Sequence, residues 1–72
     1  VTALVAEDAG LADLDAITRQ APGFLVPGGF LLMEHGCEQG ADVRGLFSQA
    51  GFSDIRTLQD LAGLDRVTLG TV

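Results

Sequence analysis

Lysine, asparagine, tryptophan and tyrosine are absent from this 72-residue sequence, and cysteine occurs once. The sequence contains four arginines and ten acidic residues, which gives a net charge of −6. Nucleic-acid binding draws on a basic patch, so this balance argues against a nucleic-acid partner and favours a solvated acidic surface. The single Cys37 excludes an internal disulfide and a cysteine metal cluster, and it is compatible with a reducing cytoplasm.

Long apolar runs are also missing. No stretch approaches the about 20 residues of a membrane-spanning helix, and no signal peptide is visible, so we expect no membrane association. Hydrophobic residues nevertheless make up 47% of the chain, although a small domain should be more polar than a large one. We therefore expect a fragment of one larger domain, without an internal boundary, whose apolar surfaces are covered by parts outside this chain.

The stretch Leu25–Gly36 is the centre of the pattern. Its Pro-Gly-Gly sequence predicts a turn, and the residues that follow predict a strand over Phe30–His35. The apolar run is short and is followed by charge, which is typical of a strand covered on both faces in a parallel sheet. Ligands bind at the carboxyl ends of such strands, where Glu34 and His35 stand.

The remaining elements are predicted from periodicity and from chain breakers. Apolar residues at three- and four-residue spacing predict an amphipathic first helix. Pro22 strains it near its end, so that it could stop near Gln20 and resume as a short turn through Phe24. Two alternating segments joined by a short loop predict antiparallel neighbouring strands. The predicted helices cover Leu11–Leu25 and Glu38–Ala50, and the two later strands cover Ser53–Gln59 and Arg66–Thr71. The order helix, strand, helix, strand, strand indicates an α/β fold.

The ends of the helices carry their own signals. Asp8 is a predicted N-cap for the first helix, because its carboxylate can accept a hydrogen bond from an exposed N–H. Gly51 is a predicted left-handed C-cap for the second helix, after which Phe52 folds back on Phe47. The segment Val1–Ala6 is short and apolar and favours an extended conformation.

Two of these features are typical of class I S-adenosylmethionine-dependent methyltransferases: Leu-x-Pro-Gly-Gly at Leu25–Gly29 and Ala-Gly-Phe at Ala50–Phe52. Other stretches resemble the C-terminal part of the HemK/PrmC family in order and spacing. They are Ala3–Ala6, Asp8-x-Gly10-Leu11, Leu32–Gly36, Gln39-Gly40-x-x-Val43-Arg44, and Asp60 followed by Arg66–Gly70. The resemblance covers essentially the whole chain.

Members of this family methylate a glutamine side-chain amide in peptide chain release factors. The resemblance implies a cytoplasmic enzyme acting on translation termination, with S-adenosylmethionine as cofactor and a release factor as partner. It also implies the C-terminal portion of a Rossmann-like sheet. Phe30–His35 would be its fifth strand and Ser53–Gln59 its sixth, with the antiparallel seventh strand, Arg66–Thr71, inserted between them.

The same resemblance indicates what this chain does not contain. The family's glycine-rich cofactor loop, its ribose-binding acid and its Asn-Pro-Pro-Tyr substrate motif lie upstream. No Gly-x-Gly-x-x-Gly pattern occurs in the sequence, and neither does asparagine. We therefore expect no catalytic, cofactor-binding or metal-binding residue in this chain, and no methyltransferase activity from the chain alone.

Glu34 and His35 are the one titratable pair that is placed like a site. They could line a pocket at the strand end, and the imidazole of His35 could act as a base. The more ordinary interpretation, which we favour, is that they close the strand end and hydrogen bond to the backbone or to upstream residues.

Other candidates have ordinary explanations as well. Cys37 could be a reactive thiol near a helix start, but no base or metal set accompanies it, so a half-buried residue without chemistry is favoured. Arg44 and Arg66 are each predicted to form a structural ion pair with an acidic residue. An acidic cluster lacks the spacing of a calcium loop and is better explained as a solvated helix face. It consists of Glu7, Asp8, Asp13 and Asp15. The four phenylalanines are predicted core residues: Phe24, Phe30, Phe47 and Phe52.

Two alternative functions stay open at this point. The chain could belong to a class I methyltransferase with another acceptor, or it could be a free-standing α/β interaction module without catalysis. Without an upstream neighbour, the strand Phe30–His35 would present an unpaired apolar edge. We therefore also expect self-association through this sheet edge, or partial disorder.

Overall fold

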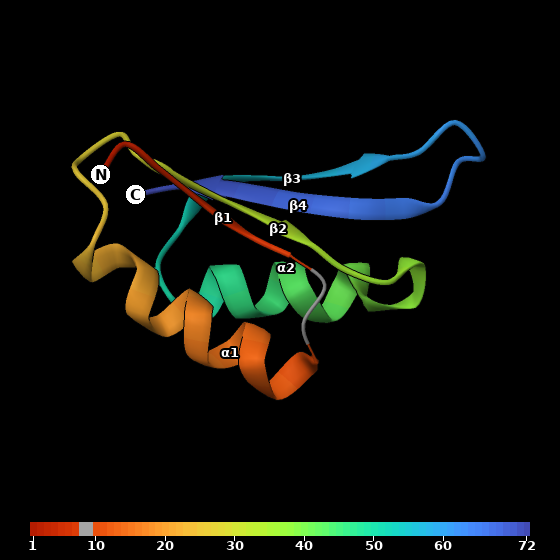
Figure 1. Cartoon of the computed structure of the whole chain (residues 1–72), viewed down its shortest axis with the longest axis horizontal. Coiled ribbons are helices and arrows are strands. Elements are labelled where there is room, and N and C mark those ends of the chain that lie inside the picture. The colour runs from red at the N-terminus through yellow and green to blue at the C-terminus, as the bar shows by residue number, and fades with distance from the viewer. Residues whose placement is uncertain (8–9) are drawn as a thin grey trace.

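The structure, a computed structural model, describes residues 1–7 and 10–72. Four strands form one sheet, and two helices pack together on one of its faces, as Figure 1 shows. The strands are β1 (Ala3–Ala6), β2 (Phe30–Glu34), β3 (Ser53–Gln59) and β4 (Asp65–Thr71), and the helices are α1 (Leu11–Gln20) and α2 (Gly40–Gln49). Short 3₁₀ turns at Ala21–Gly23 and Cys37–Gln39 complete the described elements. None of the described helices is long and apolar enough to cross a membrane.

The sheet has the strand order β1-β2-β4-β3. β4 runs antiparallel to both of its neighbours, so β2 and β3 are parallel to each other and α2 connects them. This arrangement confirms that the last strand is inserted between the two strands that precede it. The mixed sheet with its helices is the architecture expected for the C-terminal part of a class I methyltransferase.

The prediction that β2 lacks a neighbour on its upstream side is wrong. β1 pairs with β2 in parallel, with Ala3 opposite Phe30 and Ala6 opposite Met33. The strand β1 has only four residues, and its pairing with β2 is extended by Thr2, whose carbonyl accepts a hydrogen bond from the N–H of Phe30 at 3.0 Å. On that side the outer strand of the sheet is therefore β1, and β3 is the outer strand on the opposite side.

The prediction that β2 is covered on both faces is also wrong for this chain. Leu31 and Met33 are fully buried against the helices, whereas Phe30 is 38% exposed and Leu32 is partly exposed. Both helices lie on the same side of the sheet (Figure 1), so alternate residues of β2 point to an uncovered face.

The end of α1 confirms the predicted interruption near Gln20, whereas the residue at its N-cap position differs from the prediction. α1 ends at Gln20, and the chain continues as a 3₁₀ turn that contains Pro22. Proline cannot donate the hydrogen bond that a longer α-helix would need, so the predicted strain appears as a change of helix type. The residue at the N-cap position is Gly10, and the predicted cap Asp8 lies outside the described residues.

The end of α2 confirms the predicted cap. Gly51 has φ +88°, the N–H of Phe52 donates to the carbonyl of Phe47 at 3.1 Å, and the two rings lie 5.0 Å apart between centroids. The helix itself begins at Gly40, after the 3₁₀ turn, and ends at Gln49.

The core fills the space between the sheet and the two helices. Its buried residues are Leu14, Ala21, Leu25, Leu31, Met33, Val43, Phe47 and Phe52. The prediction that all four phenylalanines are core residues is therefore half wrong. Phe24 follows the 3₁₀ turn and is 65% exposed, and Phe30 points to the uncovered face.

Candidate functional site

A cavity of about 380 Å³ opens where β2 ends beside the beginning of β4. We call it the strand-end pocket. Its lining residues are Glu34, His35, Gly36, Arg66 and Val67. The antiparallel register creates it by setting Glu34 opposite Val67, and the N–H of His35 donates to the carbonyl of Arg66 at 3.0 Å. The two residues singled out by the sequence therefore stand beside an arginine that lies 31 positions or more further along the chain.

His35 is buried although it lines this pocket, with 4% of its surface exposed. Its Nε2 lies 2.8 Å from the hydroxyl of Thr68, and its Nδ1 lies 2.9 Å from the carbonyl oxygen of Gly36. Both ring nitrogens are thus engaged inside the protein. The side chain of Glu34, by contrast, is exposed.

The hydroxyl of Thr68 continues the polar contacts into the sheet. It lies 2.9 Å from the hydroxyl of Thr57 on β3, and that hydroxyl accepts a hydrogen bond from Arg44 of α2, also at 2.9 Å. Arg44 in turn pairs with Asp65 at 3.7 Å. The predicted ion-pair role of Arg44 is confirmed.

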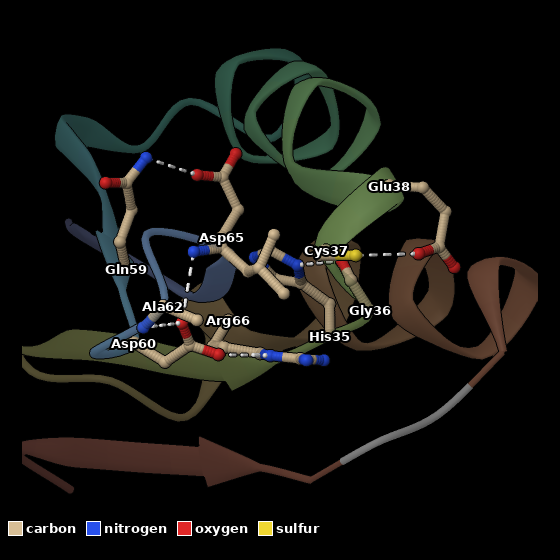
Figure 2. A network of polar contacts seen from close by, with 10 residues as sticks. His35, Gly36, Cys37, Glu38, Gln59, Asp60, Ala62, Asp65 and Arg66 are labelled. Carbon is tan, nitrogen blue, oxygen red and sulfur yellow. Dashed lines mark hydrogen bonds and ion pairs between the residues drawn. The ribbon is translucent and has the colours of Figure 1, made fainter.

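Arg66 forms the second predicted ion pair, and its partner is Asp60 at 3.0 Å. Asp60 is the first residue of the loop between β3 and β4, and Figure 2 shows its carboxylate joined to groups of this loop and to Arg66. One carboxylate oxygen accepts from the N–H of Ala62 at 2.9 Å and from that of Leu64 at 3.0 Å, and the other accepts from Arg66. The hydrogen bond from Leu64, followed by that from Arg66, lowers the pKa of the Asp60 carboxyl, and the Asp60 partner raises the pKa of Arg66.

The turn after β2 is fixed by its own polar contacts. The N–H of Gly36 donates to the side-chain oxygen of Gln39 at 2.8 Å, and the N–H of Gln39 donates back to the carbonyl of Gly36 at 3.0 Å. Cys37 is exposed, and its thiol donates to Glu38 at 3.4 Å. The N–H of Glu38 itself and then this thiol lower the pKa of the Glu38 carboxyl. The prediction of a half-buried Cys37 is therefore wrong in its burial.

The acidic residues near α1 stay apart from the strand-end pocket. Asp15 pairs with Arg19 one turn along the helix at 3.2 Å, and Glu7 is exposed. Within residues 1–7 and 10–72, no three His, Cys, Asp or Glu side chains converge as metal ligands would. Asp8 of the predicted cluster lies outside this range.

Sequence reasoning missed three residues of the site. Thr57 and Thr68 are polar residues on the helix-facing side of their strands, and Gln39 holds the turn. The alternation of β3 did place Thr57 on the same face as Ile55. A hydroxyl at such a position predicts a buried polar contact, but its partners are set by the strand register.

Comparison with known proteins finds no family model that matches the chain. It does find close relatives among characterised proteins. The chain is 51% identical over 69 residues to "Release factor glutamine methyltransferase" of Salmonella typhimurium, which covers 96% of the chain and 25% of the relative. Proteins of the same name from Vibrio cholerae and Neisseria gonorrhoeae are 54% and 56% identical, over 96% and 85% of the chain and 24% and 22% of their own lengths. The chain thus spans about a quarter of each relative.

Proposed function

Because the chain belongs to the release factor glutamine methyltransferase family and spans about a quarter of its relatives, we propose that it is the C-terminal part of such an enzyme. The parent protein would transfer a methyl group from S-adenosylmethionine to a glutamine side-chain amide of a peptide chain release factor. The observation that carries this proposal is the identity of 51% over 69 residues with a relative of that name. The cytoplasmic location follows from the same proposal, since release factors act in translation.

The strand-end pocket does not fit the cofactor. Its lining holds two oppositely charged side chains, Glu34 and Arg66, and Val67 is its one aliphatic side chain. Such a wall offers no apolar platform for an adenine ring. The sequence also lacks the glycine-rich loop that would hold a nucleotide-like ligand. We therefore assign S-adenosylmethionine to residues outside this chain.

The chain contributes architecture to the proposed enzyme. It supplies four strands, two helices on one face of the sheet, and the strand-end pocket at the edge where β2 ends. Open α/β sheets bind their ligands outside the carboxyl ends of parallel strands, and β1 and β2 end at that edge. In this proposal Glu34 and Arg66 border the acceptor region of one undivided methyltransferase domain, and the chain alone is inactive.

The test is a methyl-transfer assay with three samples: the full-length parent protein, the 72-residue chain, and buffer alone. Each is incubated with S-adenosylmethionine carrying a labelled methyl group and with a purified release factor. We expect label on a glutamine of the release factor from the parent protein and none from the other two samples.

Each other outcome has a defined meaning. Label transferred by the 72-residue chain alone would overturn its proposed inactivity. Transfer by the parent to a different acceptor, with the release factor left unlabelled, would favour the first alternative, a methyltransferase with another acceptor. A parent that transfers no methyl group would favour an interaction module.

A further inference from the structure

Four side chains form a continuous row of hydrogen bonds from α2 to the end of β2. Arg44 contacts Thr57 at 2.9 Å, Thr57 contacts Thr68 at 2.9 Å, and Thr68 contacts Nε2 of His35 at 2.8 Å. We call this row the Arg44–His35 chain. It crosses β3 and β4, and Thr68 and His35 at its inner end are buried. Every buried side-chain nitrogen or oxygen in the described residues has a partner, so no open position interrupts it.

The direction of these hydrogen bonds follows from the two ends of the row. A guanidinium can only donate, so the oxygen of Thr57 accepts from Arg44. At the other end a backbone carbonyl can only accept, so Nδ1 of His35 carries the hydrogen that reaches Gly36 at 2.9 Å.

The two hydroxyls between these ends are then fixed as well. In a neutral imidazole with its hydrogen on Nδ1, Nε2 is an acceptor, and Thr68 must donate to it. Thr68 has used its one hydrogen, so Thr57 must donate to Thr68. Each hydroxyl gives one hydrogen bond and accepts one. The assignment from Arg44 inward and the assignment from Gly36 outward therefore agree.

The opposite tautomer fails at both ends. A hydrogen on Nε2 would leave the lone pair of Nδ1 facing the carbonyl oxygen of Gly36. It would also turn the hydrogen of Thr68 toward Thr57, whose oxygen would then accept from both Thr68 and Arg44. The hydrogen of Thr57 would lose its place in the row, and an unmade hydrogen bond in a buried row is costly.

We propose that the Arg44–His35 chain holds neutral His35 in the Nδ1–H tautomer and makes it a positioning residue for the strand-end pocket. Its Nε2 lone pair is occupied by Thr68 and its hydrogen by Gly36, so neither is available to a molecule in the pocket. The imidazole instead holds the carbonyl of Gly36, while Gln39 holds the N–H of the same residue. The glycine that forms part of the pocket wall is therefore fixed at both of its backbone polar groups. This role does not depend on the reaction of the parent protein.

The test uses nuclear magnetic resonance of the 72-residue chain with ¹⁵N-labelled histidine. His35 is the one histidine in the sequence, so the imidazole signals need no assignment. At a pH where the ring is neutral, we expect a protonated Nδ1 and an unprotonated Nε2, without averaging between tautomers. A protonated Nε2, or an averaged mixture like that of free imidazole in water, would overturn the proposal.

Three variants test the donor to Nε2. Thr68→Val removes the hydroxyl, so the Nε2 resonance should move downfield toward the position of an acceptor without a donor. Thr68→Ser keeps a hydroxyl and should restore the wild-type position. Thr71→Val removes a hydroxyl from the same strand that contacts Ser53, and it should leave the imidazole signals unchanged.

The variants can also contradict the proposal. An Nε2 resonance that does not move in Thr68→Val would show that Thr68 is not its donor. If the valine variant does not fold, the wild-type tautomer and the serine variant still decide the matter, because neither removes the hydroxyl.

Discussion

Nε of Arg66 lies 3.0 Å from a carboxylate oxygen of Asp60, and this ion pair joins the wall of the strand-end pocket to the loop beyond it. The last residue of β2, Glu34, pairs with Val67, so the hairpin of β3 and β4 continues past the end of β2 (Figure 1). Beyond the end of β2, the side chain of Asp60 orders the hairpin loop by accepting hydrogen bonds from the backbone N–H groups of Ala62 and Leu64.

We expect Asp60→Ala to loosen the hairpin loop without unfolding the sheet. The N–H groups of Ala62 and Leu64 would lose their acceptor, and Arg66 would lose its partner. Amide hydrogen exchange at those two residues should become faster by about tenfold, since each loses a hydrogen bond of ordinary strength. Asp42→Ala, at an exposed acid of α2, is the control. Unchanged exchange at both amides in Asp60→Ala would contradict the role given to this carboxylate.

The same carboxylate predicts a pH dependence. Its pKa in the folded chain lies below its ordinary value of about 3.9. The stabilisation it gives is therefore complete above that ordinary value and is lost as the pH falls through the lower, folded pKa. Urea unfolding between about pH 6 and pH 2 should show stability falling at the acid end. Asp60→Asn should show a shallower fall, and an equal slope in both proteins would contradict this assignment.

The substitution His35→Ala tests whether His35 contributes to folding stability or to catalysis. It removes the acceptor of the buried Thr68 hydroxyl and leaves a space beside the pocket wall, so the free energy of unfolding should fall by about 1–3 kcal/mol. In the full-length parent protein, the pH profile of release-factor methylation should stay unchanged, because both ring nitrogens of His35 are engaged inside the protein. Glu34→Ala, at an exposed neighbour, should change stability by less than about 0.5 kcal/mol. A changed pH profile in fully folded His35→Ala would contradict this and indicate that His35 acts as a base.

Gly70 and Gly45 give a matched pair of alanine substitutions. A Cβ at Gly70 would lie 2.8 Å from the ring of Phe47, so Gly70→Ala should destabilise the chain by about 1–3 kcal/mol through overpacking. Gly45 lies inside α2 with nothing within 4 Å of such a Cβ. Gly45→Ala should stabilise the chain by about 1 kcal/mol, because alanine favours a helix. Denaturant unfolding measures both, and effects of the same sign would contradict the packing described.

Self-association of the chain is still a prediction. Because β1 covers the edge of β2, the strand edge that we expect to take part is now that of β1. The edge next to β2 is that of β1, opposite the edge formed by β3, and Val5 of β1 is 63% exposed. We expect the sedimentation of the 72-residue chain to depend on concentration, and Val5→Lys to reduce that dependence, because a charge at an edge opposes pairing of strands. Leu11→Lys on α1 is the control with an exposed leucine away from the edge. A wild-type chain that sediments as a monomer at every concentration would refute the prediction.

Local signals in the sequence were sufficient for the elements but not for their surroundings. The turn before Phe30, the cap at Gly51 and the two alternating strands each depend on a few neighbouring residues, so they could be predicted. The pairing of Ala3–Ala6 with β2 could not, because four apolar residues carry too little pattern and their partner lies 27 positions away.

The candidate site also combines features that local sequence predicts with contacts that it does not. The position of Glu34 and His35 at a strand end follows from the short apolar run before them. The contact between His35 and Thr68 spans 33 positions and depends on the antiparallel register, which no local pattern specifies. The face of the sheet that lacks helices was missed because a run such as Phe30–Met33 is compatible with covering on either or both sides.

The place of β4 has a consequence for how the chain is made. β4 is synthesised after the other three strands of this sheet, yet it lies in the interior of the sheet, between β2 and β3. Until it emerges, β3 has no partner strand and β2 is open along one side. A product that stops before Asp65 would therefore carry additional unpaired strand edges, and such edges invite aggregation. Loss of Asp65–Thr71 would damage the middle of this sheet, because it would remove the strand between β2 and β3.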